Sequence, residues 1–237
     1  MIDQKRMEAV FAGRGISLSP GQMQQLDRYA QLLTEWNQRM NLTAITDPEG
    51  ILVKHFLDSI LPFSLEPLPE GACLIDVGTG AGFPAVPLLI WRPDLQITLL
   101  DSLQKRLTFL EEVLAQCALS ARCIHLRAED GGRQPDLREQ FDAATARAVA
   151  NLRELSEYCL PYVKPGGAFY ALKGGDVKEE SENAQKAIQL LGGRMEKSLS
   201  YSLPDGSGRT LVLIKKISRT STKFPRSAAK MAKSPLA

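Results

Sequence analysis

Two patterns of apolar positions divide the chain near residue 70. In the first part apolar residues recur every three or four positions, the spacing of helices that pack by one face. One helix is expected from Ser19-Pro20, an N-cap followed by proline at the first helical position, to about Met40. A second is expected to begin at Asp47 and to be ended by Pro62 and Pro67. This part therefore predicts a helical extension packed on the rest of the chain.

After residue 70, short apolar runs alternate with amphipathic stretches. Seven strands are expected, over residues 74–77, 96–100, 123–126, 142–145, 168–172, 195–203 and 210–216. Helices between most of them imply an α/β fold, with a mainly parallel seven-stranded sheet of Rossmann-like type and helices on both faces. The last two strands follow each other directly, so we expect them to form an antiparallel hairpin at the sheet edge.

Charge is distributed unevenly. The chain has a net charge of +2, but residues 217–237 hold five basic and no acidic residues, which leaves 24 basic and 27 acidic residues in the remainder. A nucleic-acid surface on residues 1–216 would therefore be a local patch.

The sequence thus predicts three parts: a helical extension over 1–70, the α/β domain over 71–216, and a basic tail over 217–237 whose composition indicates disorder.

Other composition signals are plain. Four cysteines lie far apart with no CxxC pair, so we expect reduced packing residues and no metal site. The N-terminus lacks the apolar stretch of a secretory signal, and no run approaches 18 apolar residues. We therefore expect a cytoplasmic protein without a membrane segment.

A glycine-rich turn follows the first expected strand and reads Asp76-Val77-Gly78-Thr79-Gly80-Ala81-Gly82-Phe83. Glycines at alternate positions let the backbone turn sharply and let a ligand lie against it, beyond the carboxyl ends of the strands. A dinucleotide fingerprint needs GxGxxG, in which the third glycine would stand at position 83. Here that position is Phe83, and the third glycine, Gly82, comes one residue early. The acidic Asp76 fits a cationic cofactor better than a pyrophosphate, and could hold the amino group of a methionine moiety.

A second acidic residue, Asp101, ends the second expected strand, where a carboxylate can accept both hydroxyls of a ribose. Dinucleotide-binding proteins share this acid, so it does not discriminate by itself. Together, the turn and both acids favour S-adenosylmethionine as the cofactor. The expected contacts in the turn are Asp76, Gly78, Gly80, Gly82 and Phe83.

With further segments, the chain resembles the family called ribosomal RNA small subunit methyltransferase G, also known as glucose-inhibited division protein B. The segments are Trp36-Asn37-Gln38-Arg39-Met40-Asn41-Leu42-Thr43, Lys54-His55-Phe56-Leu57-Asp58-Ser59, the glycine turn with Pro84, Leu100-Asp101-Ser102-Leu103-Gln104-Lys105-Arg106 and Ala171-Leu172-Lys173-Gly174. The resemblance extends from about residue 20 to 216, in register, and leaves the basic tail outside.

The resemblance implies an enzyme that methylates N7 of one guanine, at position 527 in the 530 loop of bacterial 16S ribosomal RNA. It also implies that Gly78 and Phe83 contact the cofactor, that Ala128-Glu129 border the adenine, and that Arg147 closes the site. The expected partner is 16S ribosomal RNA or a precursor of the small ribosomal subunit, bound by a monomer.

Guanine N7 carries an in-plane lone pair and can attack a methyl group without losing a proton. No general base is needed, and the enzyme can act by positioning and electrostatics. Arg127, Arg147 and Lys173 follow expected strands at their carboxyl ends, so we assign them to guanine O6, phosphate or the methionine carboxylate. His55 and Asp58, three apart on a helix, are interpreted as a structural pair.

Three alternatives remain open from the sequence. A methyltransferase acting on a small molecule or protein would need a substrate insertion, and the short connections show none. An NAD-dependent oxidoreductase is opposed by Phe83. A non-enzymatic RNA-binding protein on the same fold is opposed by the intact glycines and by Asp76 and Asp101.

Overall fold

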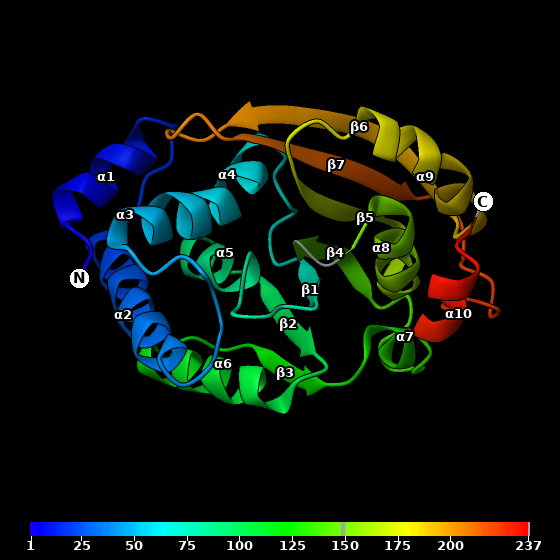
Figure 1. Cartoon of the computed structure of the whole chain (residues 1–237), viewed down its shortest axis with the longest axis horizontal. Helices are drawn as coiled ribbons and strands as arrows, with labels where there is room; N and C mark the ends of the chain where they lie inside the picture. The colour runs from blue at the N-terminus through cyan, green and yellow to red at the C-terminus, as the bar shows by residue number, and fades with distance from the viewer. Residues whose placement is uncertain (148–149, 237) are drawn as a thin grey trace.

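A seven-stranded sheet forms the centre of the computed structural model, which describes residues 1–147 and 150–236 (Figure 1). Its strand order is β3-β2-β1-β4-β5-β7-β6. The strands are β1 (Cys73–Val77), β2 (Gln96–Asp101), β3 (Arg122–His125), β4 (Phe141–Arg147), β5 (Val163–Gly174), β6 (Gly193–Ser202) and β7 (Gly208–Lys216). The first five are parallel, whereas β7 runs antiparallel to both β5 and β6. The predicted α/β class and edge hairpin are confirmed.

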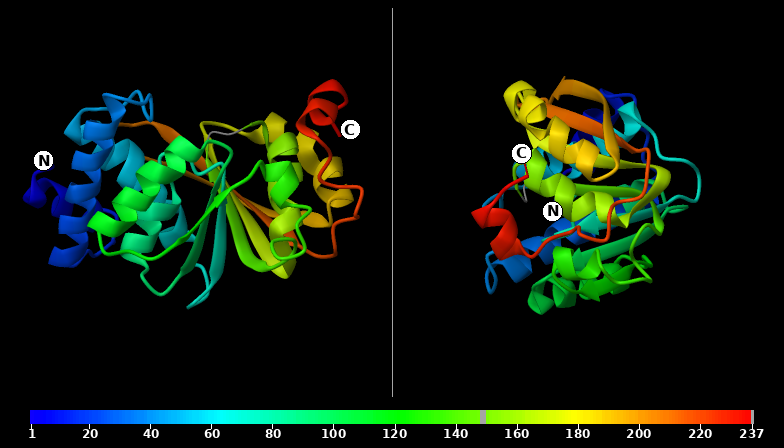
Figure 2. Two further views of the ribbon diagram at one scale, coloured as in Figure 1. Left: turned by 90° about the horizontal axis from the view of Figure 1, so that it is seen from below. Right: turned by 90° about the vertical axis from the view of Figure 1, so that its right-hand side faces the viewer.

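Helices cover both faces of the sheet (Figure 2). Those of the first part are α1 (Gln4–Ala12), α2 (Pro20–Asn37), α3 (Pro48–Gly50), the π-helical η1 (Ile51–Leu57) and α4 (Asp58–Leu65). The later ones are α5 (Ala85–Trp91), α6 (Gln104–Gln116), α7 (Ala128–Gly131), α8 (Leu152–Cys159), the 3-10 turn η2 (Leu160–Tyr162), α9 (Lys178–Leu190) and α10 (Ala228–Lys233). Within the described ranges, no helix has both the length and the apolar character needed to cross a bilayer.

Alternate strand residues enter two separate apolar clusters. Leu74 of β1 belongs to the cluster that also holds residues of α1, α2, η1, α4, α5 and α6. Ile75 and Val77 belong to the other cluster, which holds residues of α8 and α9 on the opposite face. A strand that is buried on both faces carries a continuous apolar run, which explains the strong signal of β1 and β2 in the sequence.

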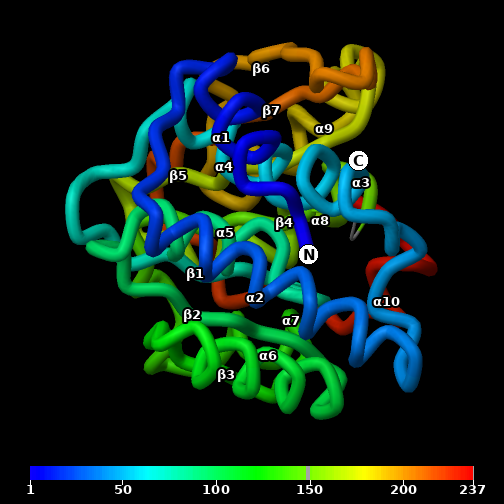
Figure 3. Tube along the Cα trace, turned by 90° about the vertical axis from the view of Figure 1, so that its left-hand side faces the viewer, coloured from blue at the N-terminus to red at the C-terminus, as the bar shows by residue number. Residues whose placement is uncertain are grey.

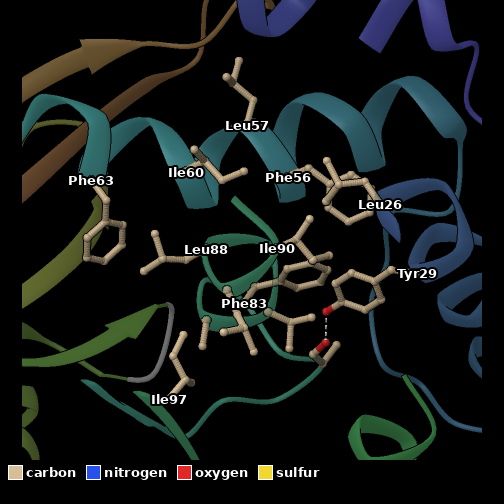
Figure 4. Packing of buried hydrophobic residues seen from close by; sticks show 14 of the residues in the cluster. Leu26, Tyr29, Phe56, Leu57, Ile60, Phe63, Phe83, Leu88, Ile90 and Ile97 are labelled. Atoms are coloured by element: carbon tan, nitrogen blue, oxygen red, sulfur yellow. Dashed lines mark hydrogen bonds between the residues drawn. The ribbon is translucent and has the colours of Figure 1, made fainter. Parts of the chain in front are cut away.

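The N-terminal helices belong to the first of these clusters. Tyr29 of α2 and Phe56 of η1 are fully buried, and their rings stack at 5.4 Å between centroids (Figure 4). Figure 3 shows α2 on the N-terminal side of the molecule, where it contacts α5 and α6. Pro62 lies inside α4 rather than ending the helix, because the buried apolar face continues to Phe63.

The C-terminal residues correct the prediction of a disordered tail. Residues 217–236 run back over the domain and end in α10, with Thr220 and Met231 buried. Arg138 donates hydrogen bonds to the carbonyls of Thr220, Ser221 and Phe224. Composition missed this order because a few anchors fix a segment whose other residues are small or polar.

Candidate functional site

A cavity of about 640 Å³ opens at the carboxyl ends of the parallel strands. One wall is the loop before α3, with Leu42 and Thr43, together with His55 of η1. The floor is the glycine turn, and the opposite wall comes from α8 and α10. The size and position are those of a ligand site in an open α/β sheet.

The glycine turn folds back on β2. The N–H groups of Gly78 and Thr79 both donate to the carbonyl of Leu100, at 2.8 and 3.0 Å. Gly78 and Gly80 have positive φ values of 72° and 60°, which disfavour residues with a Cβ. A Cβ on Gly80 would meet nothing closer than the Gly78 carbonyl oxygen at 3.9 Å, so this backbone borders open space in the cavity. The turn can therefore cradle a ligand.

Gly82 has a different role from the one expected. A Cβ at this position would lie 2.7 Å from both the Tyr29 hydroxyl and Leu110 Cδ2. Gly82 therefore allows α2 and α6 to pack under the turn, and it is not among the residues that line the cavity. The spacing of the glycines could not separate these two roles.

Asp101 lies where the sequence placed it, at the end of β2 and in the cavity wall. Its Oδ2 accepts the N–H of Gly80 at 2.9 Å, and its Oδ1 accepts the N–H of Leu103 at 2.9 Å. Arg106 reaches the same carboxylate at 3.4 Å. The side chain thus fixes the glycine turn and presents a carboxylate to the cavity.

Asp76 lies beneath the turn and not on its surface. The side chain is fully buried, and Oδ2 accepts the Thr79 hydroxyl at 2.7 Å. Among the described residues, Oδ1 has no hydrogen-bond partner. Burial raises the pKa of this carboxyl to about 7. Asp76 therefore does not line the cavity, and its one described hydrogen bond supports the turn through Thr79.

Phe83 organises the side of the cavity nearest the N-terminal helices. The ring of His55 stacks on it at 4.3 Å, and the guanidinium of Arg147 lies 4.9 Å from its centroid. Thr43 Oγ1 is 2.8 Å from His55 Nε2, and Arg147 Nη2 is 3.3 Å from His55 Nδ1. Both imidazole nitrogens are thus engaged.

His55 and Asp58 do not pair with each other, but both contact Arg147 of β4, so they do link the helical extension to the sheet. Asp58 is buried, and its Oδ2 forms ion pairs with Arg147 Nη1 at 3.4 Å and with Arg209 Nε at 3.0 Å. Burial, and then the charge of Arg147, lower the pKa of His55 to about 4, so the imidazole is neutral near pH 7. Helical spacing could not reveal that His55 lines the cavity, because its partners come from distant parts of the chain.

The other predicted residues fall into two groups. Arg127, Ala128 and Glu129 follow β3 and line the cavity, as does Arg147 at the end of β4. Lys173 does not. Its Nζ donates to the Ala150 carbonyl at 2.9 Å and pairs with Glu180 of α9 at 2.7 Å. The strand end was identified correctly, but the side chain turns towards α9.

Sequence reasoning missed one wall of the cavity entirely. Glu154 and Tyr158 of α8 face it, and so does Ala228 of α10, 77 positions after Asn151, which caps the start of α8. The composition of residues 217–237 favours a disordered, solubilising tail that could add only non-specific RNA affinity, and it gives no sign that Ala228 lines the cavity.

The strand order, the antiparallel β7 and the glycine turn define a class I methyltransferase of Rossmann-like fold. Solved structures of this class superpose on the chain. An S-adenosylmethionine-dependent O-methyltransferase from Thermotoga maritima matches with a TM-score of 0.52 and 17% identity, over 80% of this chain and 73% of its own. A variant of the 16S rRNA (adenine(1408)-N(1))-methyltransferase from Catenulisporales acidiphilia matches with a TM-score of 0.53 and 15% identity, over 62% and 86%. At these identities the likeness shows the fold alone.

Closer relatives define the family. The sequence pattern of rRNA small subunit methyltransferase G matches residues 22–205. The protein named Ribosomal RNA small subunit methyltransferase G from Acetivibrio thermocellus is 48% identical over 229 residues, 95% of this chain and 93% of the relative. Its namesake from Alkaliphilus metalliredigens is 47% identical over 224 residues, 94% of each. The chain belongs to the rRNA small subunit methyltransferase G family, which confirms the resemblance seen in the sequence.

Proposed function

We propose that this chain is the S-adenosylmethionine-dependent enzyme that methylates N7 of the guanine at position 527 in bacterial 16S ribosomal RNA. It would act in the cytoplasm, on the RNA or on a precursor of the small subunit. The observation that carries the proposal is one cavity with two differently built sides. Gly80 and Asp101 form a side suited to a nucleoside, and His55, Phe83 and Arg147 form a side with a cation and no free base.

The residues of the first side fit the cofactor. The backbone of Gly78 and Gly80 would lie against it, Asp101 would accept its ribose hydroxyls, and Ala128-Glu129 would border its adenine. When bound, the cofactor supplies a methyl group activated by a sulfonium charge. Asp76, buried below the turn, would favour that positive charge once ionised.

The second side suits a nucleophile that needs no deprotonation. His55 is neutral, and both of its nitrogens have partners, so it is poorly placed to take a proton. Arg147 would donate to guanine O6, and Arg127 to a phosphate or to the methionine carboxylate. Lys173 does not reach the cavity. It would support this side indirectly, by its charge and by joining the Ala150 carbonyl to Glu180 of α9.

The decisive test is methyl transfer from labelled cofactor. Naked 16S RNA, small subunits and a small-molecule extract are offered separately, and the product is identified by nucleoside analysis. We expect 7-methylguanosine from RNA, and none from an RNA in which the guanine at 527 is replaced by adenine. Label on an exocyclic amine, on a hydroxyl or only in the small-molecule fraction would contradict the proposal.

Asp101→Asn supplies the protein control for this assay. We expect cofactor affinity to fall by about 1.5–3 kcal/mol, the range for hydrogen bonds to a charged group, with no change in the product. Calorimetry measures the affinity, and Asp136→Asn, an exposed acid paired with Arg122, is the matched control that should bind normally. Equal affinity in both variants would remove Asp101 from the ribose site.

We also propose that the enzyme acts as a monomer. Few large apolar side chains are exposed among the described residues, and they are far apart in the sequence; they are Met1, Leu65, Leu103, Leu190 and Ile217. Sedimentation at assay concentration tests this, and a stable dimer would contradict it.

A further inference from the structure

The C-terminal arm, residues 217–236, is built into the domain. The Thr220 N–H donates to Glu139 Oε1 at 2.7 Å, and its hydroxyl donates to the Leu191 carbonyl at 2.6 Å. Further along, Arg133 donates to the carbonyls of Lys223 and Pro225. These bonds tie the backbone and the Thr220 side chain of the arm to groups of the domain, so the arm has a defined course.

One ion pair sets the position of α10. The backbone N–H and Nε of Arg226 both donate to Glu157 Oε1 at 2.8 Å, and Nη2 donates to Oε2 at 2.6 Å. The side chains are only 12% and 2% exposed. A bidentate pair of this kind fixes orientation as well as distance. Ala228, two positions after Arg226, lines the cavity, as does Tyr158 of α8.

The arm carries a charge that the rest of the chain lacks. The arm itself contains no acidic residue. Arg226 is paired with Glu157, and Arg219 lies 4.0 Å from Glu139. The other four basic residues of the arm are exposed; they are Arg219, Lys223, Lys230 and Lys233. The first 216 residues have three more acids than bases. A basic segment thus lies next to the opening of a cavity in an otherwise slightly acidic molecule. Figure 2 (left) shows α10, in red, on one side of the sheet, and α2 with the loop that follows it, in blue, on the other.

We propose that the C-terminal arm is an RNA-binding rim of the active site, in which Lys230 and Lys233 of α10 contact phosphates that flank the target nucleotide. The loop before α3 forms the opposite rim, since Thr43 and Ala228 both line the same cavity. This inference rests on the proposed function, because it takes RNA as the substrate.

A solubilising tail is the alternative, and the structure weighs against it. Such a tail needs no fixed course, whereas this one is fastened by a buried ion pair and by donors from two arginines. Phosphate contacts give RNA binding its dependence on salt, because each neutralised phosphate releases condensed counterions. A rim that binds phosphate therefore has a measurable signature that a solvated surface lacks.

The experiment compares two double variants of the full chain. Lys230→Gln with Lys233→Gln removes two charges from α10. Lys5→Gln with Lys186→Gln removes two exposed charges from α1 and α9, remote from the cavity. Binding to an RNA hairpin carrying the 530 loop is measured from about 50 to 200 mM salt, and cofactor binding is measured by calorimetry.

We expect the α10 variant to lower the slope of log K against log salt by about 1.4 to 1.8, which corresponds to two lost phosphate contacts. The control variant should keep the wild-type slope, and both should bind the cofactor as the wild type does. Equal slopes in all three proteins, or an equal loss in both variants, would overturn the inference. If the wild type methylates the guanine but the slopes do not differ, only this inference fails. If the wild type neither binds nor methylates RNA, the proposed function fails with it.

Discussion

Glycines in one turn perform separate tasks. Gly80 borders the cavity, and Gly82 makes room for Tyr29 and Leu110. Both have positive φ, so a side chain costs about 1–2 kcal/mol in either position. What differs is the space around the added Cβ, and that difference can be measured.

Gly80→Ala should chiefly weaken cofactor binding, because its Cβ would point into open space that the ligand needs. Gly82→Ala should chiefly weaken the fold, with overpacking adding about 1–3 kcal/mol to the backbone cost. Urea unfolding and calorimetry on both variants separate the two effects. If Gly82→Ala were as stable as Gly80→Ala, the close contacts beneath the turn would not be rigid.

The buried carboxyl of Asp76 predicts a pH-dependent affinity. Its pKa lies near 7, so it is about half ionised there, and a cationic ligand favours the ionised form. Cofactor affinity should therefore rise between pH 6 and 8, with a proton released on binding. In the free protein the same raised pKa gives stability that is present below pH 4 and lost as the pH rises through 7.

Asp76→Asn keeps the shape of the side chain and removes its titration. We expect calorimetry in buffers of different ionisation enthalpy to show proton release with the wild type and less with the variant. A variant that retains the full pH dependence would mean that another group controls it.

At the scale of elements, patterns of burial were predictable and directions of side chains were not. The runs that became β1 and β2 are buried on both faces, as are the central residues of β5 and β7, and such a strand gives a continuous apolar run. Convergence of the strand ends placed Arg127 and Arg147 correctly in the cavity. Lys173 shows that a strand end does not fix the direction of a side chain, since Lys173 turns towards Glu180, and this depends on where α9 packs.

Long-range partners account for the remaining differences. His55 was assigned to Asp58 by helical spacing, but both bind Arg147, which is 89 or more positions away. The C-terminal arm shows the same effect on a larger scale, because its order depends on Glu157 and Arg138, which composition does not take into account.

Arg226→Gln should release α10 without unfolding the domain. Breaking a buried pair costs about 3–5 kcal/mol, but a terminal segment can detach locally and avoid most of that loss. Hydrogen exchange should therefore become faster over 226–233 and stay unchanged in β1 and β4. Arg194→Gln, which loses an exposed pair with Glu196, is the control and should alter neither region. Unchanged exchange over 226–233 would show that the ion pair does not anchor α10.

At the scale of the whole molecule, the N-terminal helices and the sheet share one core. Tyr29, Leu33, Phe56 and Ile60 are fully buried with residues from β1 and β2. Each large buried side chain stabilises the fold by about 1.5–3 kcal/mol, and a domain has only about 5–15 kcal/mol in total.

A chain that begins at residue 71 should therefore lose its cooperative unfolding transition. Calorimetry and near-ultraviolet circular dichroism test this, with the full chain as reference. A shortened protein that melts sharply and binds the cofactor would show that the sheet has its own sufficient core.

The bond from the Tyr29 hydroxyl to the Ala81 carbonyl has an evolutionary consequence (Figure 4). It joins the helix α2, which leads into the loop with Thr43, to the turn that holds Gly80. Mutations that move α2 in order to accept a different target would also disturb the turn. A change of target is therefore coupled to a change in affinity for the methyl donor. Selection for a new target in this lineage must also find compensating substitutions under the turn.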